Sequence, residues 1–132
     1  MNVLVDSTLL IDVLRNRNDR PALLGRLIAQ GRVLCACDIT LAEVYAGMRD
    51  SERTATEELL ESLYYVPSEP SVARRAGLLR RDWARKGTTL TLTDTFLAAL
   101  AMQHGLALLT DNRKHFPMKE IVVWTPADAP LA

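Results

Sequence analysis

The chain has 132 residues, of which 48% are hydrophobic, and its 16 basic and 16 acidic residues give a formal net charge of zero. This length fits a single domain over residues 1–132, and the hydrophobic content is sufficient for a sizeable core. Because the net charge is zero, a polyanion would have to be held by a local basic patch. No window approaches the roughly 20 apolar residues that span a bilayer, so we expect a cytoplasmic protein without a membrane partner.

Short apolar runs alternate with longer segments of helical period along the chain. We expect residues 125–132 to form a loose tail. The alternation predicts an α/β fold with a mostly parallel central sheet of four to five strands flanked by helices. The predicted strands are residues 2–5, 32–36, 64–67, 107–109 and 121–124, and the predicted helices are residues 8–15, 20–30, 41–49, 53–62, 70–86 and 95–104.

The chain has two cysteines, Cys35 and Cys37. In a strand they point to the same face, and their spacing is too short for an unstrained disulfide, which predicts buried free thiols. The two histidines are distant in sequence from both cysteines, so the pattern does not predict a zinc site.

Acidic residues come directly after three of the predicted strands. Asp6 follows the first strand, Asp38 follows the second, and Asp111 with Asn112 follows the strand 107–109. The carboxyl ends of parallel strands lie at one edge of the sheet, and open α/β sheets bind ligands there. We therefore expect these side chains to lie close together.

Two further carboxylates are expected at the same edge from helices. Glu43 comes one helical turn after Thr40, and Asp94 opens the predicted helix 95–104. Each carboxylate also has a structural interpretation. Thr40 and Glu43 fit the spacing of a capping box, Asp6 and Asp94 could cap helices, and Asp38 could stabilise a turn.

Helix capping or a turn explains each carboxylate singly, but neither explains why several of them are expected at one edge of the sheet. Crowded carboxylates repel one another and raise one another's pKa, and a divalent cation removes that conflict. Oxygen ligands without cysteine or histidine suit Mg²⁺ or Mn²⁺, which usually keep several waters and bind substrate phosphates. One or two such ions could lower the pKa of a bound water and neutralise charge on a phosphate. The sequence therefore indicates phosphoryl chemistry.

Four motifs, in this order and at this spacing, resemble those of the PIN-domain nucleases, and within that family the VapC-like toxins of type II toxin–antitoxin pairs. They lie in the segments MNVLVDSTLLIDVL, ITLAEVYAGM and LTDTFLAALAMQHGLALLTDNRKHF. The resemblance covers nearly the whole chain. It implies a PIN fold, RNA cleavage that depends on Mg²⁺ or Mn²⁺, a homodimer, and neutralisation by a small VapB-like antitoxin.

The resemblance also implies a set of site residues. Asp6, Glu43 and Asp94 occupy acidic positions of the family, where they would hold the ion and one of them could orient the attacking water. The fourth acidic position of the family falls on Asn112 in this chain, whereas the carboxylate is its neighbour Asp111. Both stay candidates. The predicted catalytic residues are Asp6, Glu43, Asp94 and Asp111, and the predicted metal ligands are these four with Asn112.

Other polar residues are expected to support this set. Ser7 or Thr8, next to Asp6, and Thr110 could hydrogen-bond a carboxylate, and we expect His115 to pack against or orient the last loop. Four arginines near the edge could attract RNA phosphates, although solvated helix faces explain them equally well; they are Arg15, Arg17, Arg49 and Arg113.

Apolar residues in the segment 53–62, and in the helix expected to open at Leu41, could form a groove for a partner helix. They could equally belong to the core. A VapB-like antitoxin would be the partner implied by the resemblance.

Two alternative functions stay open. One is a non-catalytic PIN scaffold that binds RNA or a protein, which loss of the acidic set would favour, whereas Asp6, Glu43 and Asp94 are all present. The other is a magnesium-binding phosphoacceptor domain. Against it, Lys114 and Lys119 fall in a loop-like region rather than at the end of a late strand.

Overall fold

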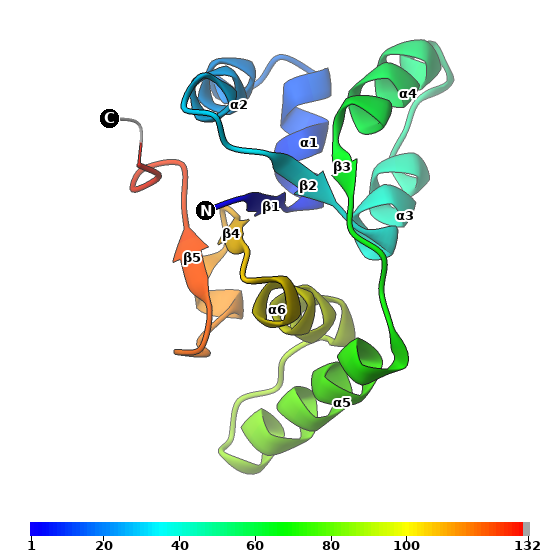
Figure 1. Cartoon of the computed structure of the whole chain (residues 1–132). Helices are drawn as coiled ribbons and strands as arrows, with labels where there is room; N and C mark the ends of the chain where they lie inside the picture. The colour runs from blue at the N-terminus through cyan, green and yellow to red at the C-terminus, as the bar shows by residue number, and fades with distance from the viewer. Residues whose placement is uncertain (131–132) are drawn as a thin grey trace.

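The structure is a computed structural model that describes residues 1–130, and it places short strands between helices on two faces (Figure 1). Within residues 1–130 the strands form one five-stranded sheet in the order β3-β2-β1-β4-β5, and every neighbouring pair is parallel. This confirms the predicted α/β class and parallel sheet. The strands are β1 (Val3–Val5), β2 (Leu34–Ala36), β3 (Tyr64–Tyr65), β4 (Ala107–Leu109) and β5 (Val122–Trp124).

The helices of the described residues lie between these strands in chain order. None of the helices in residues 1–130 is long and apolar enough to cross a membrane. Two short 3₁₀ turns, Asp50–Glu52 and Arg113–His115, lie in the connections. The α-helices are α1 (Ser7–Leu14), α2 (Arg20–Ala29), α3 (Asp38–Ala46), α4 (Arg53–Ser62), α5 (Pro70–Arg85) and α6 (Leu92–His104).

The two faces of the sheet bury separate hydrophobic cores. Leu4 of β1 and Leu108 of β4 pack with residues of α5 and α6. Val3 and Val5 pack on the other face with residues of α1, α2, α3 and α4. Successive side chains of a strand point to opposite faces, so a strand covered on both sides is apolar throughout. This packing fixes the end of β1, where Asp6 follows.

Cys35 lies in β2, and Cys37 follows that strand. Both thiols are free and buried, and both belong to the core between the sheet and the pair α5 and α6. This confirms the predicted free thiols and their common face. No metal-binding group that includes either cysteine occurs within residues 1–130.

The start of α3 differs from the prediction. The helix begins at Asp38, three residues before the predicted start at Leu41, and Cys37 is its N-cap. Thr40 is therefore inside the helix, where it is fully buried and its Oγ1 lies 3.3 Å from the Sγ of Cys37. The capping-box interpretation of Thr40 and Glu43 is wrong, because neither residue is at the helix start.

The predicted loose tail is also wrong for residues 125–130. The backbone N–H of Thr125 donates to Oδ1 of Asp128 at 2.6 Å, and Ala129 is buried in the core beneath α1 and α2. Residues 131–132 of the predicted tail lie outside the described residues.

Candidate active site

Asp6 lies at the carboxyl end of β1 and is the N-cap of α1. Its Oδ1 accepts from the backbone N–H of Ser7 at 2.8 Å, and its Oδ2 accepts from the hydroxyl of Thr110 at 2.7 Å. Thr110 follows β4, the direct neighbour of β1 in the sheet. Asp6 therefore caps a helix, as one interpretation of the sequence proposed, and also lies at the edge where the strands end.

The carboxyl group of Asp6 is held in an unfavourable environment for a charge. Asp6 is only 8% exposed. Burial raises the pKa of Asp6, the hydrogen bonds from Thr110 and Ser7 lower it, and the charges of Asp94 and Asp111 raise it further, with a net shift upward. Ionised Asp6 therefore costs folding free energy in the absence of a cation.

Glu43 approaches Asp6 from α3. Although much of Glu43 is exposed, its Oε1 accepts from the hydroxyl of Ser7 at 3.2 Å. Partial burial raises the pKa of Glu43, and the charges of Asp6 and Asp94 raise it further against the opposing effect of the Ser7 hydrogen bond. Ser7 thus donates one hydrogen bond to each of two carboxylates, through its N–H to Asp6 and through its hydroxyl to Glu43.

Asp94 lies in the first turn of α6 and is not the N-cap. Thr91 takes that position, and its Oγ1 accepts from the backbone N–H of Asp94 at 3.1 Å. The carboxylate is therefore free of a capping role, and its Oδ2 lies 3.5 Å from Nδ1 of His115. The expectation that His115 helps to orient the last loop is consistent with this contact, which joins the 3₁₀ turn Arg113–His115 to α6.

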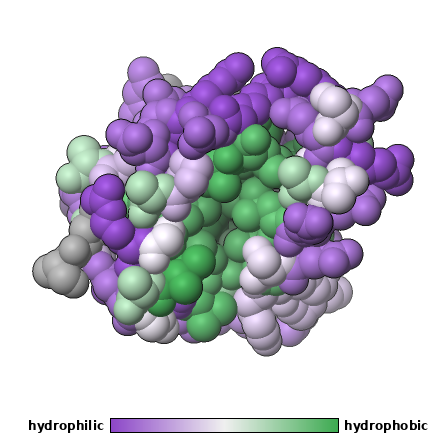
Figure 2. Space-filling model, turned by 90° about the horizontal axis from the view of Figure 1, so that it is seen from above, coloured by the Kyte–Doolittle hydropathy of each residue, from purple (hydrophilic) through white to green (hydrophobic). Residues whose placement is uncertain are grey.

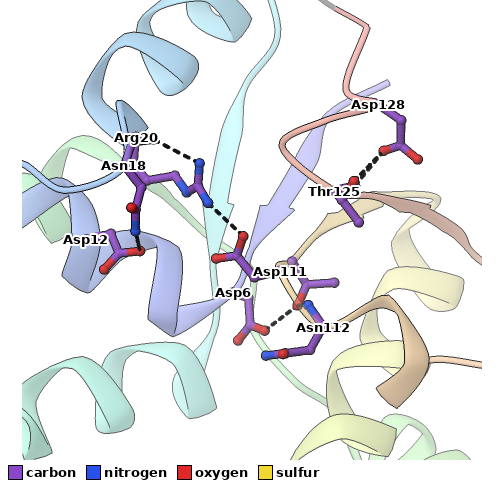
Figure 3. A network of polar contacts seen from close by, with 9 residues as sticks. Asp6, Asp12, Asn18, Arg20, Asp111, Asn112, Thr125 and Asp128 are labelled. Atoms are coloured by element: carbon purple, nitrogen blue, oxygen red, sulfur yellow. Dashed lines mark hydrogen bonds and ion pairs between the residues drawn. The ribbon is translucent and has the colours of Figure 1, made fainter.

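Asp111 and Asn112 follow β4 and lie beside Asp6 (Figure 3). The charge of Asp111 contributes to the raised pKa of Asp6, so the two carboxylates interact. Asp111 accepts at Oδ1 from the guanidinium of Arg20 at 2.8 Å. The backbone N–H of Asn112 donates to Oγ1 of Thr110 at 3.1 Å, so this loop continues the hydrogen-bonded chain that ends on Asp6.

The four predicted carboxylates therefore share one edge of the sheet, which we call the carboxylate edge: Asp6, Glu43, Asp94 and Asp111. The other candidate of the sequence, Asp38, is engaged elsewhere, because its Oδ1 accepts from the hydroxyl of Tyr65 at 2.6 Å. Within residues 1–130 no group of three or more His, Cys, Asp or Glu side chains is already closed around a point that could hold a metal ion. The charges of these carboxylates act on one another, but binding an ion would require the side chains to turn inward.

Two of the arginines expected to attract RNA are already paired. Arg15 lies 3.1 Å from a carboxylate oxygen of Glu52, and Arg113 pairs with Asp128. A cation that does contact the carboxylate edge is Arg20, which sequence reasoning missed. Nothing local to the sequence marks it, since its partner lies 91 positions later.

The chain matches known proteins over most of its length. Residues 3–120 match the family model of the PIN domain. Ribonuclease VapC19 of Mycobacterium tuberculosis is 32% identical over 115 residues, which cover 87% of this chain and 92% of that protein. Ribonuclease VapC2 of Haemophilus influenzae is 26% identical over 121 residues, which cover 88% of this chain and 90% of that protein.

Solved structures share the fold. A chain of the toxin–antitoxin complex from Klebsiella pneumoniae superposes with a TM-score of 0.77 at 27% identity and covers 95% of this chain and 98% of its own. A chain of VapBC2 from Rickettsia felis, bound to a DNA fragment from their promoter, gives a TM-score of 0.81 at 18% identity with the same coverage. These likenesses confirm the PIN-like fold expected from the sequence. The chain belongs to the PIN-domain family, and its relatives within that family include VapC proteins.

Proposed function

We propose that this chain is a metal-dependent endoribonuclease that acts as the toxin of a VapBC-type pair. The observation that carries the proposal is the carboxylate edge. Four acidic side chains from four separate segments lie along this edge, and burial together with mutual repulsion raises the pKa of Asp6 and Glu43. Such an arrangement costs stability, and a bound divalent cation would recover it.

The donor set fits Mg²⁺ or Mn²⁺. Carboxylate oxygens, with the amide oxygen of Asn112 nearby, are the ligands these ions prefer, and water and substrate oxygens commonly complete their shell. Asp6 and Glu43 each accept hydrogen bonds, yet a carboxylate has about four lone-pair positions and can bind a cation as well. Asp6, Glu43 and Asp94 would hold the ion, with Asp111 or Asn112 as the fourth ligand.

The chemistry that such an ion supplies when bound is activation of water and neutralisation of charge on a phosphodiester. The residues of this chain would position it. Thr110 and Ser7 fix the orientation of Asp6 by the hydrogen bonds at 2.7 and 2.8 Å. Because orientation of the reacting groups contributes a large part of enzymatic rate enhancement, these two residues are expected to matter for rate as well as stability.

A hollow beside Asp94 offers a place for the RNA backbone. Its volume is about 270 Å³, and it is lined by Lys114, His115 and the threonine-rich segment 88–91. An ammonium group and several hydroxyl groups are suitable donors to phosphate oxygens. RNA as the substrate is also supported by the names of the relatives, which are ribonucleases.

The test is cleavage of a structured RNA pool by the purified protein, with Mg²⁺ or Mn²⁺ against a chelator. Asp6→Asn removes the charge and keeps one acceptor oxygen for the N–H of Ser7, while its amide N–H₂ group faces the hydroxyl of Thr110, which can accept as well as donate. Asp82→Asn is the matched control, because Asp82 is an exposed carboxylate of α5 that pairs with Arg81. We expect metal-dependent cleavage that Asp6→Asn abolishes and Asp82→Asn retains.

Two results would contradict the proposal. Cleavage that continues in chelator would exclude the metal. A folded protein that binds Mn²⁺ but cleaves no RNA would favour the non-catalytic PIN scaffold instead.

We also propose that a VapB-like antitoxin binds an apolar groove between α2 and α4. The groove has a volume of about 600 Å³, and Figure 2 shows it as a hydrophobic hollow bordered by polar residues. Ile28 and Tyr64, on its walls, are 57% and 63% exposed, which is costly for apolar side chains without a partner. The residues that define the apolar groove here are Leu24, Ile28, Val33, Leu59, Leu63 and Tyr64.

The groove only partly matches the sequence expectation. The segment 53–62 contributes Leu59 as expected, whereas the helix that was expected to open at Leu41 does not line it. Solved relatives of this fold are toxin–antitoxin complexes, which supports a partner of this kind. An amphipathic helix with apolar residues at intervals of three and four would fit such a groove.

The homodimer implied by the family stays a proposal. An apolar hollow of about 270 Å³ lies between α3, α5 and α6, and Leu92 on its rim is 60% exposed. We propose this surface as the contact between two copies. Light scattering should give the mass of a dimer for the parent chain and of a monomer for Leu92→Asp; a monomeric parent would contradict the proposal.

A further inference from the structure

Arg20, the first residue of α2, reaches the carboxylate edge from the side (Figure 3). One terminal nitrogen donates to Oδ1 of Asp111 at 2.8 Å, and the other donates to the carbonyl oxygen of Asn18 at 3.0 Å. The side chains of Arg20 and Asp111 are only 16% and 33% exposed. Solvent therefore screens this pair less than it screens an ion pair on an open surface.

The loop before α2 is shaped to aim this side chain. Asn16, Asn18 and Asp19 have φ values of 51°, 55° and 56°, in the left-handed region that residues other than glycine seldom adopt. The side-chain amide of Asn18 donates to Asp12 at 3.3 Å, which ties the loop to α1. Three left-handed residues in four positions cost free energy, so the direction of Arg20 is fixed at some expense to folding.

The contact between Arg20 and Asp111 is incomplete as a structural ion pair. Arginine commonly meets a carboxylate with two parallel N–H groups, whereas here one terminal nitrogen contacts Asp111. The Nε of Arg20 is buried and has no hydrogen-bond partner in residues 1–130. A buried donor without an acceptor is destabilising. The N–H group at Nε of Arg20 could therefore still donate a hydrogen bond to a ligand.

We propose that Arg20 is a positioning residue that holds the carboxylate of Asp111 out of the metal site and competes with the ion for it. The inference rests on the proposed metal-dependent function. Asp111 is close enough for its charge to affect Asp6, yet its oxygen is engaged by Arg20. In the resting protein, Asp6, Glu43 and Asp94 are then the available ligands, and Asp111 joins them when Arg20 releases it.

An RNA phosphate is the group that would draw Arg20 away. When Arg20 turns out of its present contact, a phosphate oxygen near the edge offers an acceptor both to the nitrogen that now binds Asp111 and to Nε, which is buried and unpartnered until then, and guanidinium groups suit this contact. Arg20 would thereby couple substrate binding to completion of the metal site. The carboxylate of Asp111 and the phosphate would then compete for the same cation, the guanidinium of Arg20.

The test is titration of the full chain with Mn²⁺, followed by calorimetry or by the electron paramagnetic resonance of the free ion. Arg20→Gln should bind Mn²⁺ about five- to tenfold more tightly than the parent, a range usual for coupling between two sites. In an Asp111→Asn background the same substitution should change the affinity by less than about twofold, because the effect acts through Asp111. Arg26→Gln removes the same charge from an exposed position of α2 and should leave the affinity unchanged.

Unchanged or weaker Mn²⁺ binding by Arg20→Gln would overturn the inference, as would an equal gain in both backgrounds. If thermal unfolding shows that Arg20→Gln is not folded, Arg20→Lys is used instead. It should give a smaller gain that Asp111→Asn again removes. RNA cleavage by the parent, measured in parallel, separates the two hypotheses. A parent that binds Mn²⁺ without cleavage contradicts only the proposed function, whereas a parent and an Arg20→Gln variant that both fail to bind Mn²⁺ contradict both.

Discussion

The carboxylate edge and the apolar groove are both unfavourable to the isolated chain, for opposite reasons. At the edge, charged groups lie where water is partly excluded, and the pKa of Asp6 and Glu43 rises. In the groove, apolar groups such as Ile28 and Tyr64 stay in water. The first arrangement is relieved by a cation and the second by an apolar partner, so each region indicates the chemistry of its own ligand.

The two regions are also assembled differently. The edge depends on hydrogen bonds between segments that are distant in sequence, such as the bond from Thr110 to Asp6. The groove follows from the packing of α2 and α4 beside the β2 and β3 side of the sheet. Changes at the edge should therefore alter chemistry and charge, whereas changes in the groove should alter partner binding alone.

After Asp6, the largest effect is expected at Asp94. Asp94→Asn should lower the rate of RNA cleavage by about 10²- to 10³-fold, the loss seen when one group that stabilises developing charge is removed. Asp94 has no capping role, so the fold should be unaffected. Asp82→Asn, an exposed carboxylate of α5, is the control for initial-rate measurements with circular dichroism as the check on folding. Equal rates for the parent and Asp94→Asn would contradict the assignment.

The groove should respond in binding and not in cleavage. Ile28→Asp should weaken the affinity for a VapB-like antitoxin by about tenfold or more, because a charge would be buried in an apolar contact. The cleavage rate of the free protein should not change. Leu78→Asp places the same charge on an exposed apolar position of α5 and should leave the affinity, measured by calorimetry, as in the parent. An equal loss of antitoxin affinity in both variants would contradict the groove as the binding site.

Thr110 should show how far the edge depends on its supporting hydrogen bonds. Thr110→Val removes both the donor to Asp6 and the acceptor for the backbone N–H of Asn112, which should lower the free energy of unfolding by about 1–3 kcal/mol. Losing this donor should also raise the pKa of Asp6 further, so the rise of cleavage with pH should shift to higher pH. Urea unfolding and a pH–rate profile measure the two effects. The cost in stability should be smaller when Asp6→Asn is already present, and full additivity would contradict the contact.

The smallest effect is expected in the thermal stability of Glu43→Gln, which keeps an acceptor for Ser7 and removes the charge. The pKa of Glu43 is raised in the folded protein, so Glu43 costs stability at neutral pH, and this cost disappears as pH falls below the ordinary pKa of a glutamate. Glu43→Gln should therefore melt slightly higher than the parent at neutral pH and equally at acid pH. Thermal unfolding across this range tests the sign, and a lower melting temperature at neutral pH would contradict it.

Local patterns predicted much of the fold because the elements are regular. The bounds of β4 and α4 agree with the predicted ranges 107–109 and 53–62. The start of α3 did not, since its N-cap Cys37 has no capping hydrogen bond and carries no local signal. The end of the chain was misjudged because Asp128 and Ala129 are ordered by contacts that short-range composition does not reveal.

The candidate site was predictable to the extent that it follows from strand order. Asp6 and Asp111 follow adjacent parallel strands, so their proximity could be inferred from position alone. Asp38 also follows a strand, but its carboxylate accepts a hydrogen bond from Tyr65, a side-chain contact that strand order does not predict. Arg20 could not be predicted, because its reach to Asp111 depends on the left-handed loop before α2.

The most direct test of the metal site is the anomalous diffraction of Mn²⁺ in crystals of this chain. We predict a manganese peak at the carboxylate edge, about 2.1 Å from oxygens of Asp6 and Asp94, and no such peak in crystals of Asp6→Asn. A peak elsewhere, or none at Mn²⁺ concentrations that support RNA cleavage, would contradict the claim that these carboxylates form the metal site.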